Sequence, residues 1–218
     1  MVATVLSTAD ARKAISELIG RYKDAHYYLD FSTDVDLMVA AIISAQTRDE
    51  VVNSLTPALF KKYKTVNDYA EARQEELSGY ISRVSFAGAK AKNIIKTCKA
   101  IVERHGGKIP RSMDELVELP GIGRKTANTI LINAYGIVEG IPVDTWVIKL
   151  SSRIGLSGSS DPLGIERDLM GIVDKKDWKT IAYVLKSHGK AICQSQAPLC
   201  SKCIIKSLCP RNGVRESR

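Results

Sequence analysis

Three observations in the sequence predict an all-α fold. Apolar residues recur at helical spacings of three and four residues in nearly every segment. No run alternates apolar and polar residues for long enough to indicate a sheet, and no Asn-Gly or Asp-Gly turn separates two strand-like runs. The chain also has no low-complexity tract and no repeat at a solenoid period. We therefore expect a globular protein built from helices.

Three stretches show the helical pattern in chain order, each with one apolar face. These faces comprise Ala11, Ala14, Ile15 and Leu18, then Val51, Leu55 and Leu59, then Ala91, Ile94, Ile95, Cys98 and Ile101. The third helix is expected to end at the paired glycines 106–107, a usual helix exit. The residues "SMDE", from Ser112 to Glu115, fit a capping box that opens the next helix. Two glycines and Pro142 in "YGIVEGIPVD", residues 135–144, then indicate a linker between helical segments.

Composition limits the class of protein. Hydrophobic residues make up 44% and charged residues 26% of the chain, and no run approaches the ~20 apolar residues that span a bilayer. The start, "MVATVLSTAD", has no basic residues before its short apolar run, unlike a secretory signal. We expect an intracellular protein, in the cytoplasm or nucleoid, without a membrane partner. The net charge of +8 favours a polyanionic partner.

The stretch "LPGIGRKTANTI" predicts a phosphate-binding turn. Pro120 has a fixed φ, and Gly121 and Gly123 can take positive φ and expose bare amides. With Ile122 in the core and a helix beginning near Arg124, these amides and the helix N-terminus would face one phosphate. A tight interhelical turn without a ligand is the open alternative.

Four of the five cysteines lie within seventeen residues near the C-terminus, at Cys193, Cys200, Cys203 and Cys209, whereas Cys98 is isolated. An intracellular chain keeps thiols reduced, so this group predicts a metal site rather than two disulfides. Four thiolates can hold either tetrahedral zinc or an iron–sulfur cluster. One C-x2-C pair with unequal flanking arms favours the cluster, because zinc ribbons usually pair two such knuckles.

Several motifs together resemble the endonuclease III family of DNA base-excision glycosylases. The hairpin resembles that of the family from Leu119 to Ala127, and "VDTWV" at residues 143–147 resembles the family's aspartate motif. The residues "SAQTRD" at 44–49 are similar to its DNA-facing glutamine motif, and the cysteines fall at its C-x6-C-x2-C-x5-C spacing. The resemblance extends from about residue 10 to Cys209.

This resemblance implies an architecture, a cofactor and a partner. It implies a six-helix barrel domain at residues 27–137 that bears the helix–hairpin–helix, and an iron–sulfur cluster domain formed by residues 1–26 and 138–218, with a cleft between them. The four cysteines would hold a [4Fe–4S] cluster. The partner would be double-stranded DNA with a damaged base or abasic site, for which a monomer suffices. The family's basic cluster loop is the uncharged "QSQAPL" here, so Lys202 and Lys206 are candidates to contact DNA in its place.

Lys125 and Asp144 are the candidate catalytic pair. Lys125 lies on the first turn of its predicted helix, where the positive helix dipole lowers the pKa of the amine. A neutral amine can attack C1′ of a deoxyribose and leave an imine. The resemblance identifies Lys125 with the family's nucleophile, against the alternative of a plain phosphate contact. Asp144 alone would be taken as a helix N-cap, and the resemblance makes it the second catalytic group as well.

A glycosylase must rotate its target nucleotide out of the duplex and fill the vacated space. By resemblance, Gln46 enters that space and Phe86 is a wedge, although an ordinary core position is an equal alternative for Phe86. Gly121, Gly123 and Arg124 of the hairpin would complete the DNA contacts.

The sequence departs from the family pattern at several positions near these residues. Ser85 and Ala87 replace the glycine and the aromatic residue that usually flank the wedge position. Trp146 replaces a histidine, and it can neither titrate nor accept a hydrogen bond. Lys190 replaces an arginine and loses a bidentate pairing.

The resemblance implies a bifunctional DNA glycosylase and abasic-site lyase that removes oxidised pyrimidines and nicks the strand by β-elimination through a lysine Schiff base. Two alternatives stay open at this point. One is a mismatch glycosylase for thymine or uracil opposite guanine, although members of that kind often lack the lysine. The other is a non-catalytic helix–hairpin–helix DNA-binding module, against which the presence of both Lys125 and Asp144 argues.

Overall fold

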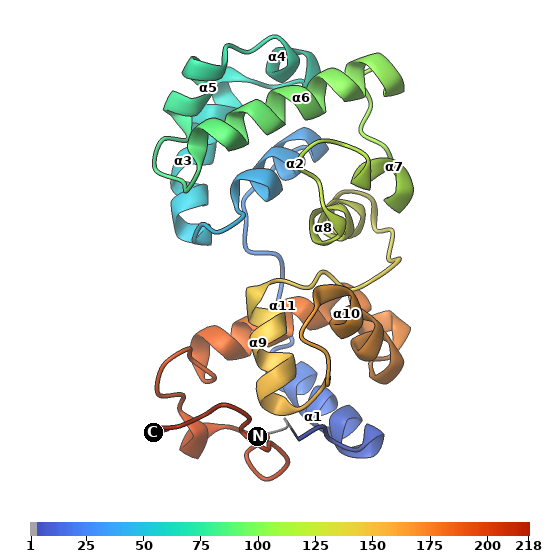
Figure 1. The fold of residues 1–218 in the computed structure, drawn as a ribbon, viewed down its shortest axis with the longest axis vertical. Coiled ribbons are helices and arrows are strands. Elements are labelled where there is room, and N and C mark those ends of the chain that lie inside the picture. The colour runs from blue at the N-terminus through green and yellow to red at the C-terminus, as the bar shows by residue number, and fades with distance from the viewer. Residues whose placement is uncertain (1–3) are drawn as a thin grey trace. The chain divides into compact units, whose positions relative to one another are not determined.

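The computed structural model describes residues 4–218 and contains no strand among them, which confirms the predicted all-α fold (Figure 1). The helices are α1 (Thr8–Arg21), α2 (Asp34–Ile43), α3 (Asp49–Lys62), α4 (Val66–Ala70), α5 (Gln74–Tyr80), α6 (Ala87–His105), α7 (Met113–Val117), α8 (Arg124–Tyr135), α9 (Thr145–Ile154), α10 (Pro162–Ile172) and α11 (Trp178–Ala191). Two 3-10 helices are η1 (Lys175–Asp177) and η2 (Cys200–Lys202). No helix in the described range is long and apolar enough to cross a membrane.

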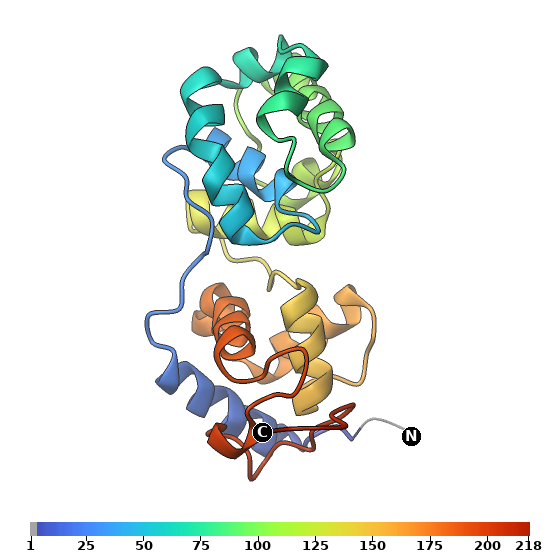
Figure 2. The same ribbon diagram turned by 90° about the vertical axis from the view of Figure 1, so that its left-hand side faces the viewer.

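The chain divides into two compact units. Residues Tyr28–Glu139 form the first, called here the hairpin unit. Residues up to Tyr27 and Gly140–Arg218 form the second, called here the cysteine unit. The chain therefore passes between the units in two connecting segments, both visible in Figure 2.

Helix α2 is the centre of the hairpin unit. Its sequence "DVDLMVAAII" is apolar on nearly all sides, and every residue from Val35 to Ile43 is buried. A helix that is apolar all round must be enclosed by other elements, and α2 packs against α3, α6 and α8. Thr33 and Asp36 satisfy its first amides in a reciprocal capping box.

Helix α6 carries the predicted apolar face on its inner side. Ala91, Ile94, Cys98 and Ile101 are fully buried, and Ile95 is half-buried. This helix packs against α2, α4 and α5. It ends at His105, where Gly106 takes the left-handed backbone expected of a helix exit. Ser112 likewise caps α7 as predicted, and its oxygen accepts from the Glu115 amide.

The buried face of α3 differs from the predicted one. Val52, Thr56 and Leu59 face the core, whereas Val51 and Leu55 are only half-buried. The prediction was right for Leu59 and wrong for Val51 and Leu55, because the inner face includes Val52 and the polar residue Thr56 in their place. Thr56, which is 1% exposed, belongs to the inner face.

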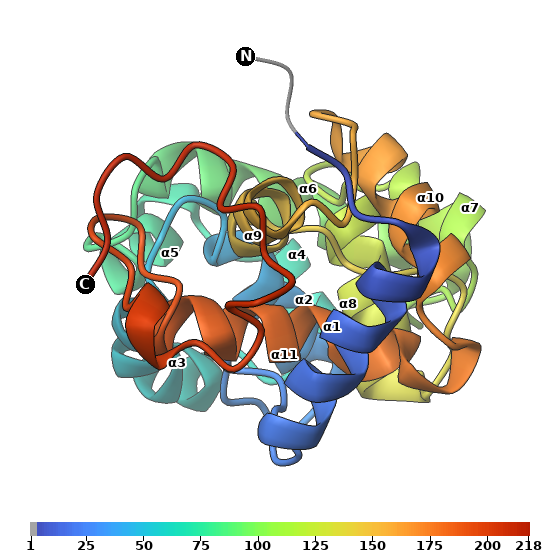
Figure 3. The same cartoon turned by 90° about the horizontal axis from the view of Figure 1, so that it is seen from below.

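The cysteine unit joins segments from both ends of the chain. Helix α1 packs against α10 and α11, and α9 packs against the same two helices (Figure 3). The predicted apolar face of α1 is fully buried. It shares one core with Leu150 of α9 and Leu185 of α11. The N-terminal helix and residues Gly140–Arg218 therefore fold as one body.

Candidate functional site

The turn before α8 is fixed by Gly121. Its φ is +80°, and a Cβ at this position would lie 3.0 Å from the Cβ of Asn93 on α6. Ile122 is buried beside it. Thr97, also on α6, donates its hydroxyl to the carbonyl of Pro120. The left-handed backbone and the close approach of α6 therefore both require glycine at position 121.

Gly123 corrects the expectation that both glycines take positive φ. Its φ is −94° and its ψ is 174°, an extended backbone that any residue adopts. A Cβ here would meet no heavy atom within 4 Å, so no packing inside the chain requires glycine. Gly123 is the N-cap of α8 and supplies no side-chain cap. The helix N-terminus is therefore open to an anion from outside the chain.

Arg124 and Lys125 form the start of α8. Arg124 is exposed and Lys125 is half-buried. The first turn of this helix contains no acidic residue. The helix dipole therefore places positive potential at this helix N-terminus. The neutral state of the Lys125 amine stays a prediction.

Asp144 is the N-cap of α9 in the cysteine unit. Its Oδ1 accepts hydrogen bonds from the amides of Trp146 and Val147, both at 2.9 Å. Both bonds fall on the same oxygen. Within the described part of its unit, the capping role leaves Oδ2 without a hydrogen-bond donor, and the half-buried carboxylate can use that oxygen for another purpose.

Trp146 of α9 packs against α11, and the sequence did not reveal this contact. A Cβ on Gly189 of α11 would fall 2.4 Å from ring atom Cε3 of Trp146, so only glycine lets the indole lie there. The ammonium of Lys149 lies 4.9 Å from the indole centroid, within range of a cation–π contact. Packing against Gly189 thus holds Trp146, whose amide donates to the Asp144 cap.

Gln46 and Phe86 lie on separate segments that the hairpin unit brings together. Gln46 follows α2 and Phe86 is the N-cap of α6, and both are exposed. Phe86 is 68% exposed, so it is not an ordinary core aromatic. The hydroxyl of Ser85 donates to the carbonyl of Gln46 at 3.2 Å. Both candidate DNA-contacting side chains therefore project from one joined surface.

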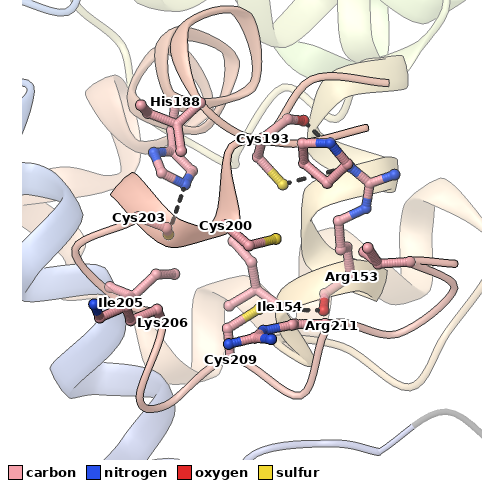
Figure 4. Close-up of a pocket in the computed structure, with 13 residues that line it drawn as sticks. Arg153, Ile154, His188, Cys193, Cys200, Cys203, Ile205, Lys206, Cys209 and Arg211 are labelled. Carbon is pink, nitrogen blue, oxygen red and sulfur yellow. Dashed lines mark hydrogen bonds between the residues drawn. The ribbon is translucent and has the colours of Figure 1, made fainter. Parts of the chain in front are cut away.

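The four C-terminal cysteines line a single cavity of the cysteine unit (Figure 4). Cys193 follows α11, Cys200 begins η2, and Cys203 and Cys209 lie on the segment after it. Cys98 is buried on α6 in the other unit, on the apolar face predicted for that helix.

Side-chain nitrogens of two residues approach the sulfurs of this cavity. Arg153 Nη1 lies 3.5 Å from the Sγ of Cys193 and donates to the carbonyl of Gln194 at 2.8 Å. His188 Nε2 lies 3.5 Å from the Sγ of Cys203, and its Nδ1 lies 3.0 Å from the hydroxyl of Tyr22. Burial lowers the pKa of His188 to about 4 and raises the pKa of Cys203 to about 11.

The donor set fits a multi-atom cluster. Four soft thiolate donors face one space, and hydrogen-bond donors to ligand sulfurs are a common feature around iron–sulfur clusters. Among the described residues, no group of three His, Cys, Asp or Glu side chains lies in the arrangement that holds one metal ion. The fit to a cluster rests on the four cysteine donors and on the nitrogens beside them.

The loop between the first two cysteines has no charged residue, but charged residues from other segments contact it. Arg218 donates from Nε to the carbonyl of Ala197 at 3.3 Å and from Nη2 to Oε1 of Gln194 at 3.4 Å. Lys149 on α9 donates to the hydroxyl of Ser195. Sequence reasoning missed both residues because neither lies near this loop along the chain. Lys202 and Lys206 are exposed beyond it.

Known proteins resemble this chain over most of its length. A model described as "HhH-GPD superfamily base excision DNA repair protein" matches residues 39–175. Endonuclease III of Synechocystis sp. is 45% identical over 189 residues, which cover 87% of this chain and 86% of that protein. Endonuclease III of Bacillus subtilis is 41% identical over 198 residues, which cover 90% of each chain.

Solved structures agree with these relatives. The structure of a trapped endonuclease III–DNA covalent intermediate matches with a TM-score of 0.91 at 36% identity, and covers 95% of this chain and 97% of that chain. A thermostable thymine-DNA glycosylase matches with a TM-score of 0.83 at 19% identity, covering 94% of this chain and 97% of that chain, which shows a shared fold.

Proposed function

Because the chain belongs to the endonuclease III family within the HhH-GPD superfamily of base excision DNA repair proteins, we propose that Lys125 and Asp144 carry out its chemistry. The protein is a bifunctional DNA glycosylase and abasic-site lyase. Such an enzyme cuts the bond between a base and its deoxyribose, and then cuts the DNA backbone on the 3′ side of that sugar.

The backbone at Gly123 is the observation that supports the role of Lys125. Asn93 and the left-handed φ account for glycine at position 121, whereas no contact among the described residues accounts for it at position 123. A phosphate bound at the N-terminus of α8 would fill the open space, because helix amides and the helix dipole both favour an anion. Lys125 follows on the same turn, so a strand held there would present its sugar to the amine.

Lys125 acts as the nucleophile in the first cut. Its neutral amine nitrogen forms a bond to C1′ while the glycosidic bond breaks, and the base leaves with the bonding electrons and takes up a proton. Oδ2 of Asp144 accepts the proton that the amine nitrogen gives up, and the carboxylate charge offsets positive charge that develops on the sugar. The sugar ring then opens, its oxygen is protonated, and C1′ becomes an imine of Lys125.

The imine makes the second cut possible. An imine at C1′ acidifies the protons on C2′, so a base can remove one of them. The bond from C3′ to oxygen then breaks, and the 3′ phosphate leaves with the electrons. Water finally hydrolyses the imine and returns the free Lys125 amine. Both cuts therefore depend on one covalent intermediate.

The DNA contacts divide between two surfaces of the hairpin unit. Gly121, Gly123 and Arg124 hold the phosphate backbone, which positions the duplex without reading its sequence. Gln46 enters the space that the flipped nucleotide leaves, and Phe86 enters the stack beside it. The partner is double-stranded DNA with a damaged base or abasic site, and one protein monomer serves one flipped nucleotide.

The four cysteines hold a [4Fe–4S] cluster in this proposal. When bound, the cluster cross-links four positions of the C-terminal segment and contributes folding free energy. The cysteine unit then corresponds to the iron–sulfur domain expected at residues 1–26 and 138–218. The hairpin unit corresponds to the six-helix barrel domain expected at 27–137.

Oxidised pyrimidines are the proposed lesions, and base release from defined duplexes tests this. Matched duplexes carry thymine glycol, uracil opposite guanine, a T·G mismatch or an abasic site. We expect release of thymine glycol with strand cleavage, and cleavage of the abasic duplex. Release from the mismatches alone would replace the lesion class with that of a mismatch glycosylase. Binding without release or cleavage on any duplex would contradict the enzymatic function.

A further inference from the structure

Gln46 and Phe86 share an uncommon backbone conformation. Their φ angles are 54° and 59°, in the left-handed region that residues with side chains seldom adopt. Both residues are exposed, so burial of their own side chains does not impose it. Such a conformation persists only where surrounding contacts fix it.

Lys90 supplies contacts on the Gln46 side. It lies in the first turn of α6, is 7% exposed, and donates from Nζ to three oxygens. These are the carbonyl of Ile43 at 2.8 Å, the carbonyl of Ala45 at 2.5 Å and Oγ1 of Thr47 at 3.1 Å. The three acceptors bracket Gln46 along the chain. Because α2 ends at Ile43, the ammonium also satisfies a helix C-terminus, where positive charge is favourable.

The same residue is bonded to Phe86. The backbone amide of Lys90 donates to the carbonyl of Phe86 at 3.0 Å. Ser85, which precedes Phe86, donates its hydroxyl to the carbonyl of Gln46 at 3.2 Å. The two segments are therefore joined twice, and Ser85 and Lys90 together are called here the loop clamp.

Lys90 is an unusual choice for a buried position. Burial lowers the pKa of its ammonium because the charged form loses hydration. Its hydrogen-bond partners in the described chain are neutral oxygens, so no ion pair compensates the burial. An apolar side chain would avoid this unfavourable term but could not bond the three oxygens around Gln46. The side chain is therefore better explained by the shape of that loop than by core stability.

We infer that the loop clamp holds Gln46 and Phe86 as one preformed element, which enters the duplex at the flipped nucleotide. This inference rests on the proposed function, in which both side chains meet the DNA stack. A preformed element loses less conformational freedom when it fills the gap. The clamp therefore speeds the steps that require an opened stack, and it leaves the chemistry of Lys125 unchanged. Ser85 and Lys90 are positioning residues.

Two variants and two matched controls test the clamp. Lys90→Met keeps the long stem and removes the ammonium, and Ser85→Ala removes the hydroxyl. The controls are Lys99→Met, an exposed position of α6, and Ser82→Ala, an exposed position before Ser85. Each protein cleaves an abasic site in single-turnover reactions, first in duplex DNA and then in a single strand that has no stacked partner to displace.

We expect Lys90→Met to cleave the duplex on the order of tenfold more slowly, the scale of losing hydrogen bonds from a charged donor. Ser85→Ala should lose less, and both should match wild type on the single strand. The two controls should match wild type on both substrates. Equal losses on both substrates, or wild-type rates for both clamp variants, would overturn the inference. If thermal melting shows that Lys90→Met is unfolded, the exposed Ser85→Ala variant decides.

Gln46→Ala distinguishes failure of the clamp from failure of the proposed function. If Gln46 acts through the clamp, Gln46→Ala slows duplex cleavage and adds little further loss to Lys90→Met. Fully additive losses would overturn the clamp while leaving the DNA role of Gln46 intact. Wild-type duplex cleavage by Gln46→Ala alone would reject that DNA role, and the inference with it.

Discussion

At the scale of single residues, the Asp144 carboxylate combines structure and chemistry. Oδ1 caps α9 through two amides, and Oδ2 is not needed for that cap. The capping interpretation and the catalytic interpretation of this aspartate therefore do not exclude each other. An asparagine at this position would keep an oxygen for the cap and lose the charge.

We predict that Asp144→Asn lowers the single-turnover rate of base excision on the order of 10²-fold or more, the scale for a positioned acid–base or electrostatic group. Cleavage of a preformed abasic site should fall less, because no base has to depart. The melting temperature and the DNA affinity should stay close to wild type.

Asp161→Asn is the matched control, because Asp161 caps α10 through Oδ1 in the same way. This variant should retain wild-type excision. Equal losses in the two variants would show that the cap matters and that the charge of Asp144 does not.

Other residue-scale contacts could not be predicted from the sequence. Position 146 could be recognised as a departure from the family pattern, but its packing partner Gly189 lies on a different helix. The contact of Arg218 with the loop at Gln194 has the same origin, because it joins positions far apart in the chain. Periodicity and motif spacing describe neighbours along the chain and carry no information about such pairs.

At the scale of elements, the hairpin before α8 separates two glycines with different tasks. The fold itself requires glycine at position 121, because φ is +80° and the Asn93 side chain lies nearby. No contact with residues 4–218 requires glycine at position 123, and the missing side chain leaves the helix N-terminus open. Motif spacing predicted the turn and its phosphate role, but only the backbone angles distinguish the two positions.

We predict that substitution at Gly121 lowers stability, whereas substitution at Gly123 weakens DNA binding. Gly121→Ala should lower the free energy of unfolding by about 1–2 kcal/mol, through left-handed strain and the clash with Asn93. The free energy of unfolding of Gly123→Val should stay within about 1 kcal/mol of the wild-type value, since only the N-cap preference changes. This variant should bind every duplex more weakly, with the ranking of lesions preserved, because the side chain occupies the phosphate position.

Denaturant melts and fluorescence anisotropy with a duplex panel measure both effects. If Gly123→Val changed the ranking of lesions and spared affinity, the phosphate role of the hairpin would be wrong.

Helices were predicted best where one apolar face is continuous. The faces of α1 and α6 came directly from the spacing of their apolar residues. The face of α3 was misplaced because it includes the buried polar residue Thr56. Apolar periodicity could not predict that the loops at Gln46 and Phe86 are joined, because a hydroxyl and an ammonium make the contacts between them.

At the scale of the whole molecule, the cysteine cavity joins distant parts of one unit. Residues of α9, α11 and the C-terminal segment line it, and α1 packs against the same α11. The cysteine spacing alone predicted a metal site, whereas the nearby nitrogens of Arg153 and His188 could be placed only in the folded chain. Loss of a cluster here should therefore affect the fold of the unit.

We predict that the purified protein is brown and contains iron and acid-labile sulfide in near-stoichiometric amounts. Cys203→Ala should lose most of both and yield largely insoluble chain, because the cluster contributes folding free energy. Cys98→Ala is the matched control, since Cys98 is buried in the other unit, and it should keep the full iron content. Elemental analysis and visible absorption measure the outcome. A colourless, fully active protein that contains zinc would reject the cluster.

The central claim is that one lysine forms the covalent intermediate in both cuts, and borohydride trapping tests it most directly. Reduction of the imine links the protein permanently to an abasic duplex, and mass spectrometry of the digested adduct identifies the attached residue. We expect the adduct on Lys125, no adduct with Lys125→Ala, and wild-type trapping with the exposed control Lys99→Ala. Lys125→Ala should still bind the duplex, because the hairpin amides and Gln46 are unchanged. An adduct on another amine, or wild-type trapping by Lys125→Ala, would contradict the account.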